Sequence, residues 1–292
     1  MVSRDDAMKF LMAARWQQSD DVFMRAGNAH PHSRLSVYNS EKLAYSYLFA
    51  LQEGTLARKS SNRFGFSLAY SYLCRMKDSV LILSGGVDST TLLYEERERI
   101  ALAISFDYGS KHNEQEIPFA KWHCEKLGIR HITIPLDFMT RYFHSSLLLG
   151  GEEIPEGHYA DENMKSTVVP FRNGIMLSIA VGIAESNELK YVMMANHGGD
   201  HTIYPDCTPQ FVDAFDQAAS AGTYVHVRLR SPYTNITKAD IARRGKLLGI
   251  DYSKTWSCYK GGKKHCGKCG TCVERREAFA EAGIDDRTEY ED

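Results

Sequence analysis

Glycine and hydroxyl residues gather in one short stretch of the chain, Ser84–Thr90, whose sequence is SGGVDST. The apolar run VLIL precedes it, and a helical pattern follows it. Two adjacent glycines permit backbone conformations that are closed to other residues, so several N–H groups can point into one small space. The hydroxyls of Ser84, Ser89 and Thr90 surround that space, and a following helix adds partial positive charge. The stretch therefore predicts a phosphate or pyrophosphate site between a strand and a helix.

The alternative for this stretch is an ordinary turn in which Asp88 or Ser89 is the helix N-cap. Its position favours the phosphate site, because ligands of open α/β sheets bind where a strand leads into a helix. The motif is not the P-loop, since no lysine follows the glycines. Asp88 is our candidate for Mg²⁺ coordination, directly or through water, and this role is compatible with capping.

Four of the seven cysteines form a cluster near the C-terminus: Cys258, Cys266, Cys269 and Cys272. Two overlapping C-x-x-C turns let three of these sulfurs face one centre, and with the fourth cysteine this predicts one closed, structural Zn²⁺ site per chain. An iron–sulfur cluster is the first alternative, and a redox or sulfur-relay thiol pair is the second. With four cysteines present, His265 is expected to be a solvated neighbour and not a ligand.

The composition is that of an ordinary globular protein, with 43% hydrophobic and 25% charged residues. Its 292 residues suit one or two domains. The 35 basic and 37 acidic residues give a net charge of -2, which argues against wide nucleic-acid contact. No run of 18 apolar residues and no convincing signal peptide appear, so we expect no transmembrane helix and a cytoplasmic location.

Strand and helix patterns alternate from Lys77 onward. Strands are expected at about 79–84, 101–106, 131–134, 191–195 and 226–229, and helices at about 89–99, 114–127, 173–186, 209–221, 238–248 and 273–282. Gly128 is expected to cap the end of the helix at 114–127, and Thr237 to cap the start of the helix at 238–248. Alternation with short links predicts an α/β fold, a parallel sheet covered by helices on both faces. The polar segment 137–167 is expected to be a long loop. Residues 1–75 show no motif, and because Met76 precedes the first strand they are either a helical appendage or a leader that is not native.

The chain from Lys77 onward resembles the 7-cyano-7-deazaguanine (preQ0) synthase family of the PP-loop ATP pyrophosphatases. The matching pieces are SGGVDSTTLL (84–93), FDYGSKH (106–112), VPFRN (169–173), HGGDHTIYPDC (197–207) and WSCYKGGKKHCGKCGTC (256–272). The resemblance implies that ATP binds along Leu83, Ser84, Gly85, Gly86, Val87, Asp88, Ser89, Thr90, Thr91, Leu92 and Leu93. It also implies a homodimer. We expect each chain to have three parts: an extension of unknown role at 1–75, a PP-loop domain at 76–255, and a zinc-binding segment packed on that domain at 256–292.

The family's reaction is an ATP-dependent carbon–nitrogen ligation in queuosine biosynthesis. The resemblance implies that 7-carboxy-7-deazaguanine, ammonia and ATP, with Mg²⁺, give the nitrile through an adenylated carboxylate and an adenylated amide, releasing AMP and diphosphate. We expect small-molecule substrates and neither a nucleic acid nor a membrane as partner.

Six further side chains are candidates for catalysis or substrate binding. Lys111 and Arg172 suit phosphates or the substrate carboxylate, although a surface salt bridge is an alternative for each. Further along the chain, Asp200 or Asp206 is a candidate to accept hydrogen bonds from the amino and ring N–H groups of a deazaguanine. Tyr204 is a candidate to stack on the face of that base. His197 completes this substrate-binding group, and an Asx-turn is the alternative for Asp206.

Three other functions stay open at the level of sequence. One is a PP-loop tRNA sulfurtransferase, whose cysteines would carry sulfur or an iron–sulfur cluster. A second is a non-enzymatic nucleotide sensor with a zinc knuckle. A third is a related enzyme that joins the activated deazaguanine to another amine.

Overall fold

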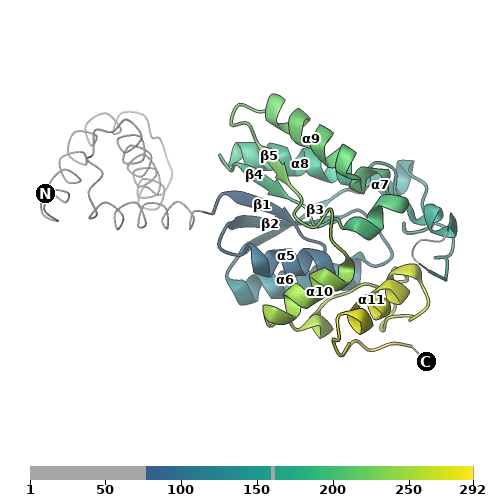
Figure 1. Ribbon diagram of the computed structural model, residues 1–292. Coiled ribbons are helices and arrows are strands. Elements are labelled where there is room, and N and C mark those ends of the chain that lie inside the picture. Colours follow the sequence, from purple (N-terminus) through teal and green to yellow (C-terminus); the bar gives the residue numbers. More distant parts are fainter. Residues whose placement is uncertain (1–76, 159–161, 292) are drawn as a thin grey trace, which may run out of the picture. The chain divides into compact units, whose positions relative to one another are not determined.

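A computed structural model describes residues 77–158 and 162–291, so the expected extension at 1–75 lies outside the described residues. One parallel sheet with the strand order β3-β2-β1-β4-β5 organises the described part (Figure 1). Its strands are β1 (Ser79–Ile82), β2 (Ile100–Asp107), β3 (Arg130–Pro135), β4 (Tyr191–Met193) and β5 (Arg228–Arg230). The predicted α/β class is confirmed.

Helices cover both faces of the sheet (Figure 1). One face carries α8 (Arg172–Ser186) and α9 (Pro209–Ala221), and the other carries α5 (Val87–Glu95), α6 (Asn113–Leu127) and α10 (Lys238–Leu247). The shorter elements are α7 (Phe138–Tyr142), η1 (Glu162–Thr167), η2 (Gly198–Thr202), η3 (Pro205–Cys207) and η4 (Tyr252–Lys254), and α11 (Gly270–Glu281) follows the cysteine cluster.

Successive side chains of the strands contribute alternately to two hydrophobic cores. Val80 and Ile104 belong to the cluster that includes α8 residues, whereas Leu81 and Ala103 belong to the cluster that includes α5 and α6 residues. Because successive side chains of a strand point to opposite faces, a strand that is buried on both sides must be apolar throughout. This explains the continuous apolar run that precedes the glycine pair.

One alternative and one expectation about local structure were wrong. Gly86, and neither Asp88 nor Ser89, is the N-cap of α5, and no side chain caps this helix. The two side chains lie inside the first turn of α5, which begins earlier than expected, so they can face a ligand instead. The segment 137–167 is also not a structureless loop, since it contains α7 and η1 among its described residues.

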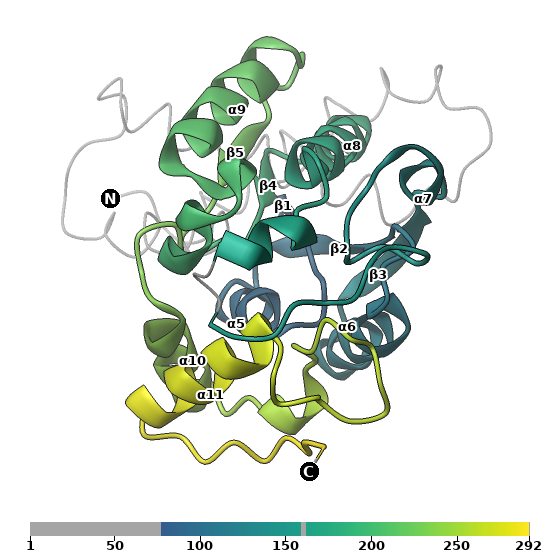
Figure 2. The ribbon, with the colours of Figure 1, turned by 90° about the vertical axis from the view of Figure 1, so that its right-hand side faces the viewer.

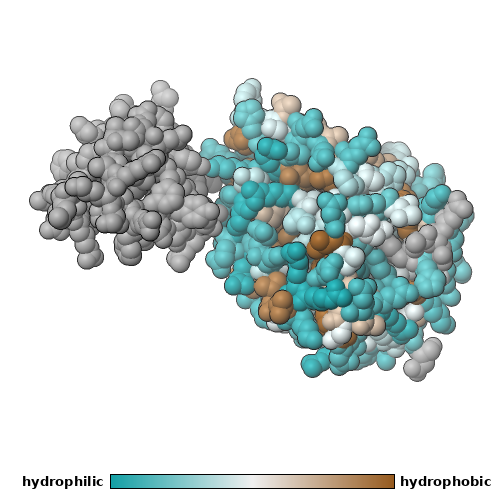
Figure 3. Space-filling model, viewed as in Figure 1, coloured by the Kyte–Doolittle hydropathy of each residue, from teal (hydrophilic) through white to brown (hydrophobic). Residues whose placement is uncertain are grey.

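One stretch, Asn163–Ser186, is long and apolar enough to cross a membrane by length and composition. It includes α8, where Leu177 and Ala180 are fully buried in the core cluster that contains Val80 and Val192. We therefore assign its apolar character to packing against the sheet. Figure 3 shows a mostly hydrophilic surface on one face of the described part, with small hydrophobic patches.

The C-terminal segment packs beside the first strand–helix turn. α11 lies against α10 (Figure 2), and the Trp256 N–H donates to the Gly85 carbonyl at 3.1 Å. Arg275 on α11 is fully buried and donates to the Asp286 carboxylate at 3.1 Å and to the Tyr252 carbonyl at 2.9 Å. These charge-assisted bonds fix the segment in place, so it can form one wall of a site.

Candidate active site

An open cavity of about 220 Å³ lies at the carboxyl ends of β1 and β4. The chain runs from β1 toward β3 on one side and then returns to place β4 on the other side of β1. Such a reversal of strand order leaves a crevice at which α/β sheets bind ligands. The cavity is lined by the glycine loop, by α6 and α8, by residues after β4 and by Trp256, Ser257 and Tyr259.

The glycine loop turns its donors and hydroxyls toward one another. The Ser89 hydroxyl accepts the Ser84 N–H at 3.2 Å and the Gly85 N–H at 3.4 Å, and the Ser84 hydroxyl accepts the Gly86 N–H at 3.1 Å. These are the groups that the sequence predicted around a phosphate, and an anion can replace the hydroxyls as acceptor. The buried Thr90 hydroxyl has no hydrogen-bond partner among the described residues.

Gly85 is required by close packing as well as by its conformation. Its φ of 101° lies in a region that other residues rarely adopt, and a Cβ there would overlap the Glu116 carbonyl of α6. The glycine loop is therefore held directly against α6.

Behind the loop, Asp88 belongs to an ionic cluster with side chains from α10, from α11 and from the residues after β4. Its Oδ2 lies 3.3 Å from Lys238 Nζ at the start of α10, and Lys238 lies 2.5 Å from Glu274 Oε2 on α11. His197 Nε2 lies 3.5 Å from Glu274 Oε1 and from Asp200 Oδ1. The cluster joins the glycine loop to the residues after β4 and to the C-terminal segment.

The cluster keeps Lys238 charged despite its burial. Burial alone would lower the pKa of Lys238, but the carboxylates of Asp88, Glu274 and Asp200 outweigh it and raise that pKa. For Glu274, burial dominates and raises its pKa, against the opposing influence of Lys238. A charged Lys238 beside Asp88 therefore adds positive charge at the edge of the cavity.

The other carboxylate oxygen of Asp88 is available to a ligand. Its Oδ1 is buried and has no hydrogen-bond partner among the described residues. A buried carboxylate oxygen without a partner is costly unless a ligand satisfies it, and Mg²⁺ prefers such oxygen ligands. The residues present therefore fit a Mg²⁺ ion that accompanies a nucleotide.

Arg172 reaches the cavity from the start of α8. Its guanidinium donates to the Tyr108 hydroxyl at 3.0 Å and lies over the Tyr108 ring. Burial opposes the charge of Arg172, but Tyr108, Tyr259, Tyr204 and Asp206 raise its pKa well above the usual value. A permanent, partly buried positive charge is thus available in the cavity for an anionic group.

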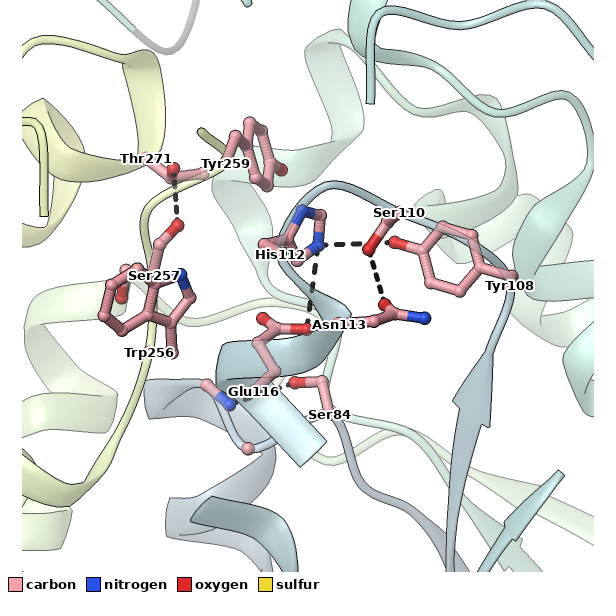
Figure 4. Close-up of polar contacts among 12 residues, drawn as sticks. Ser84, Tyr108, Ser110, His112, Asn113, Glu116, Trp256, Ser257, Tyr259 and Thr271 are labelled. Carbon is pink, nitrogen blue, oxygen red and sulfur yellow. Dashed lines mark hydrogen bonds and ion pairs between the residues drawn. The ribbon is translucent and has the colours of Figure 1, made fainter. Parts of the chain in front are cut away.

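Two titratable side chains of the α6 region face the same cavity (Figure 4). His112 Nε2 lies 3.6 Å from Glu116 Oε2 and 3.4 Å from the Tyr108 hydroxyl. Burial, and then Arg172, lowers the pKa of His112 to about 3, so this imidazole is neutral. Burial raises the pKa of Glu116 to about 8, with Arg172 opposing the rise.

Three of the candidate residues after β4 form hydrogen bonds with neighbouring residues of the site. The Asp200 carboxylate accepts the His197 N–H at 2.9 Å, and Gly199 N–H donates to His197 Nδ1 at 3.0 Å, which closes a capping box around η2. The Tyr204 hydroxyl lies 3.0 Å from the Thr167 hydroxyl. Asp200 and Tyr204 line the cavity, whereas His197 lies behind it, against Asp88 and Glu274.

The remaining two candidates lie farther from the cavity. Asp206 accepts the Asn173 N–H at 2.8 Å, so its carboxylate sits at the N-terminus of α8, where the helix dipole favours it. Lys111 Nζ donates to the Gly151 carbonyl at 3.2 Å and to the Glu152 carbonyl at 2.6 Å. Neither side chain is among those that line the cavity, although Arg172 and Asn173 beside Asp206 are.

The four cysteines converge as their spacing predicts. All are buried, and their sulfur atoms lie within 4.8 Å of one another, with 4.0 Å between those of Cys266 and Cys272. Four sulfurs about 2.3 Å from a tetrahedral Zn²⁺ would lie about 3.8 Å apart, so the set fits zinc. The Cys269 N–H donates to Cys266 Sγ at 3.3 Å, which favours thiolate there.

The expectation that His265 is solvated was wrong. Its side chain is 3% exposed, Nε2 accepts the Ser257 N–H at 3.0 Å, and the ring packs on Trp256 with 4.1 Å between centroids. His265 thus braces the segment that holds both Trp256 and the cysteines.

Several residues of the site were not found from the sequence, chiefly Lys238, Glu274, His112 and Glu116. Lys238 follows the predicted cap Thr237 directly, but nothing in one sequence shows that the start of α10 meets the glycine loop. The i, i+4 spacing of His112 and Glu116 puts both on one helix face and was the available signal.

Comparison with known proteins identifies the family. A family model described as queuosine biosynthesis protein QueC matches residues 78–283. The 7-cyano-7-deazaguanine synthase of Porphyromonas gingivalis (strain ATCC BAA-308 / W83) is 62% identical over 217 residues, covering 74% of this chain and 99% of that protein. The 7-cyano-7-deazaguanine synthase of Desulfotalea psychrophila (strain LSv54 / DSM 12343) is 53% identical over 217 residues, with the same coverage of 74% and 99%.

Among solved structures, NMN synthetase from Francisella tularensis gives a TM-score of 0.42 at 12% identity, covering 85% of this chain and 87% of that one, a likeness too distant to support an argument. The family match spans the sheet, the glycine loop, the cavity and all four cysteines. The chain therefore belongs to the queuosine biosynthesis protein QueC family.

Proposed function

We propose that this protein is a 7-cyano-7-deazaguanine synthase, which converts 7-carboxy-7-deazaguanine and ammonia into the nitrile preQ0 for queuosine biosynthesis. The single observation that carries this proposal is the family match over residues 78–283, together with relatives of that name that are covered over nearly their full length. It favours this reaction over the tRNA sulfurtransferase alternative.

ATP supplies the energy in this proposal, and the glycine loop holds its leaving pyrophosphate. The proposal is supported by the inward-facing N–H groups and hydroxyls of Ser84–Thr90 and by the positive end of α5. The neighbouring residues Leu83 and Thr91–Leu93 complete the nucleotide-binding stretch by holding it on β1 and α5. Asp88 would hold the Mg²⁺ that neutralises phosphate charge, through the oxygen without a partner.

Two activations turn a poor electrophile into a nitrile. The substrate carboxylate attacks the α-phosphate, the bond to pyrophosphate breaks, and an acyl-adenylate results. Ammonia then forms the carbon–nitrogen bond while AMP leaves with the electron pair of the carbon–oxygen bond. The amide oxygen is adenylated in turn, and loss of the second AMP leaves the nitrile. Catalysis of this kind consists mainly of positioning and charge stabilisation.

We assign the substrate to the part of the cavity between α8 and the residues after β4. Arg172 would pair with the carboxylate or a phosphate, and Asp200 and Tyr204 would contact the deazaguanine; the position of all three in the cavity lining supports this. Asp206 and His197 would act behind them, on α8 and on Asp88. Lys111 stays a candidate phosphate ligand that must first exchange its bonds to the carbonyls of residues 151 and 152.

We further propose that the cysteine cluster holds one structural Zn²⁺, since four buried sulfurs leave no open coordination position. A cytoplasmic homodimer without nucleic-acid or membrane partners is the assembly that we propose. The net charge of -2 supports the absence of nucleic acid. Light scattering of the purified chain tests the dimer.

The proposed function is tested by incubating the protein with ATP, ammonium and 7-carboxy-7-deazaguanine and following products by mass spectrometry. Nitrile, transient amide and AMP are expected, and omission of ammonium should stop the nitrile but not the first release of pyrophosphate. AMP formation with no dependence on the carboxylate would refute the proposal, and a conjugate with another amine would favour the related enzyme.

A further inference from the structure

The Glu116 carboxyl is a buried acidic group on the wall of the cavity, and no part of the reaction described above uses it. Its side chain is 15% exposed, and no hydrogen bond to its carboxyl oxygens is seen within the described residues. A largely buried carboxyl without such partners is unfavourable unless solvent or a ligand meets it, so its presence in a cleft indicates a function.

The carboxyl faces the glycine loop. A Cβ placed on Gly86 would lie 3.8 Å from Glu116 Oε1, and Figure 4 shows the carboxyl beside Ser84 and across from His112. Glu116 Oε1 therefore borders the space where the loop would hold the leaving group, and the reacting carbon of an adenylated substrate would lie close by.

The surroundings suit a proton acceptor better than an ion-pair partner. His112, 3.6 Å away, is neutral, and Tyr108 and Arg172 are the other titratable groups that face Glu116 across the cavity. Arg172 is already bonded to Tyr108 at 3.0 Å. Burial raises the pKa of Glu116 to about 8, near the working pH of a general base.

The proposed reaction needs a base at two points, and this inference rests on that reaction. We propose that Glu116 is the general base that takes protons from nitrogen at the reacting carbon in both halves of the reaction. In the first half, ammonia forms the carbon–nitrogen bond, its nitrogen gives a proton to the Glu116 carboxylate, and AMP departs with the electron pair of the carbon–oxygen bond.

In the second half, the adenylated amide loses one N–H proton to solvent and the other to Glu116. The electron pair of that last N–H bond forms the third carbon–nitrogen bond, and the carbon–oxygen bond breaks toward AMP. After each half Glu116 returns its proton to water, to which it has access because its side chain is partly exposed.

The test compares Glu116→Gln with the matched control Glu114→Gln, an exposed glutamate on the same helix. Two rates are measured for each protein: nitrile formation from the amide, and carboxylate-dependent exchange of pyrophosphate into ATP. Using the amide removes ammonia and its own titration from the assay, and the exchange reaction moves no N–H proton.

For Glu116→Gln we expect nitrile formation to fall about 100-fold or more while exchange stays within about threefold of the parent. In the parent, nitrile formation should rise with pH through about 8, because the carboxylate is the active form. Glu116→Gln should lack this rise, and Glu114→Gln should match the parent throughout.

Nitrile formation by Glu116→Gln at the parent rate would overturn the assignment, and so would equal losses of exchange and nitrile formation, which indicate a structural role. A parent protein with neither exchange nor nitrile formation would instead overturn the proposed function, and the role of Glu116 with it.

Discussion

Asp88 presents two different carboxylate oxygens. Oδ2 lies 3.3 Å from Lys238, whereas Oδ1 is buried and has no hydrogen-bond partner among the described residues. Lys238 also lies 2.5 Å from Glu274, so the cation keeps a carboxylate even when Asp88 is replaced. A substitution at Asp88 should therefore affect ligand binding more than folding.

We predict that Asp88→Asn reduces carboxylate-dependent AMP formation by about 100-fold or more, because the charge that balances a bound cation is lost. Zinc content and the thermal unfolding midpoint should stay near those of the parent. Asp285→Asn, at an exposed aspartate outside the cavity, is the control. AMP formation at the parent rate by Asp88→Asn would refute the metal-binding role.

A second prediction at the residue scale separates close packing from backbone strain. Gly85 and Gly128 both have positive φ, of 101° and 64°, but only Gly85 has a backbone carbonyl in the space of a Cβ. Gly85→Ala should lower the free energy of unfolding by about 3 kcal/mol, and Gly128→Ala by about 1 kcal/mol. Urea denaturation measures both, and equal losses would show that the contact with α6 contributes little.

At the scale of elements, the structure shows why a four-cysteine segment belongs to this enzyme. Trp256, Ser257 and Tyr259 line the cavity. The backbone N–H of Trp256 is hydrogen-bonded to the Gly85 carbonyl, and its ring packs against His265. Fixing the cysteines therefore fixes one wall of the site. The proposed structural zinc site would give the thiols this task, which requires no sulfur chemistry.

Cys269→Ser tests this assignment. One sulfur fewer should reduce zinc content and folded yield, whereas the specific activity of the folded fraction should change less than the yield does. Metal analysis and soluble yield are measured together with AMP formation. A well-folded but inactive Cys269→Ser protein would point to catalytic thiol chemistry, and iron in place of zinc would refute the metal assignment.

At the scale of the whole molecule, local patterns predicted the fold but not all of the site. The alternation of strands and helices, the Gly128 cap and the Thr237 cap are properties of short segments, and the structure confirms them. The meeting of Asp88 with Lys238 and Glu274 depends on how α5, α10 and α11 pack, which one sequence does not specify.

Lys111 is a predicted site residue whose side chain does not line the cavity. Its residue type and motif suggested a phosphate ligand, yet in the structure its side chain bonds the carbonyls of residues 151 and 152. Arg172 was predicted on the same grounds and does line the cavity, since α8 begins at that residue beside Tyr108. Whether a cationic residue reaches a site depends on the turn that carries it.

In the proposed reaction, both carboxylate oxygens of the substrate leave on AMP. Substrate labelled with ¹⁸O at both oxygens should be converted with unlabelled ATP and ammonium, and AMP and nitrile then measured by mass spectrometry. Two AMP are expected for each nitrile, each AMP carrying one ¹⁸O. Unlabelled AMP, or nitrile without AMP in that ratio, would contradict it.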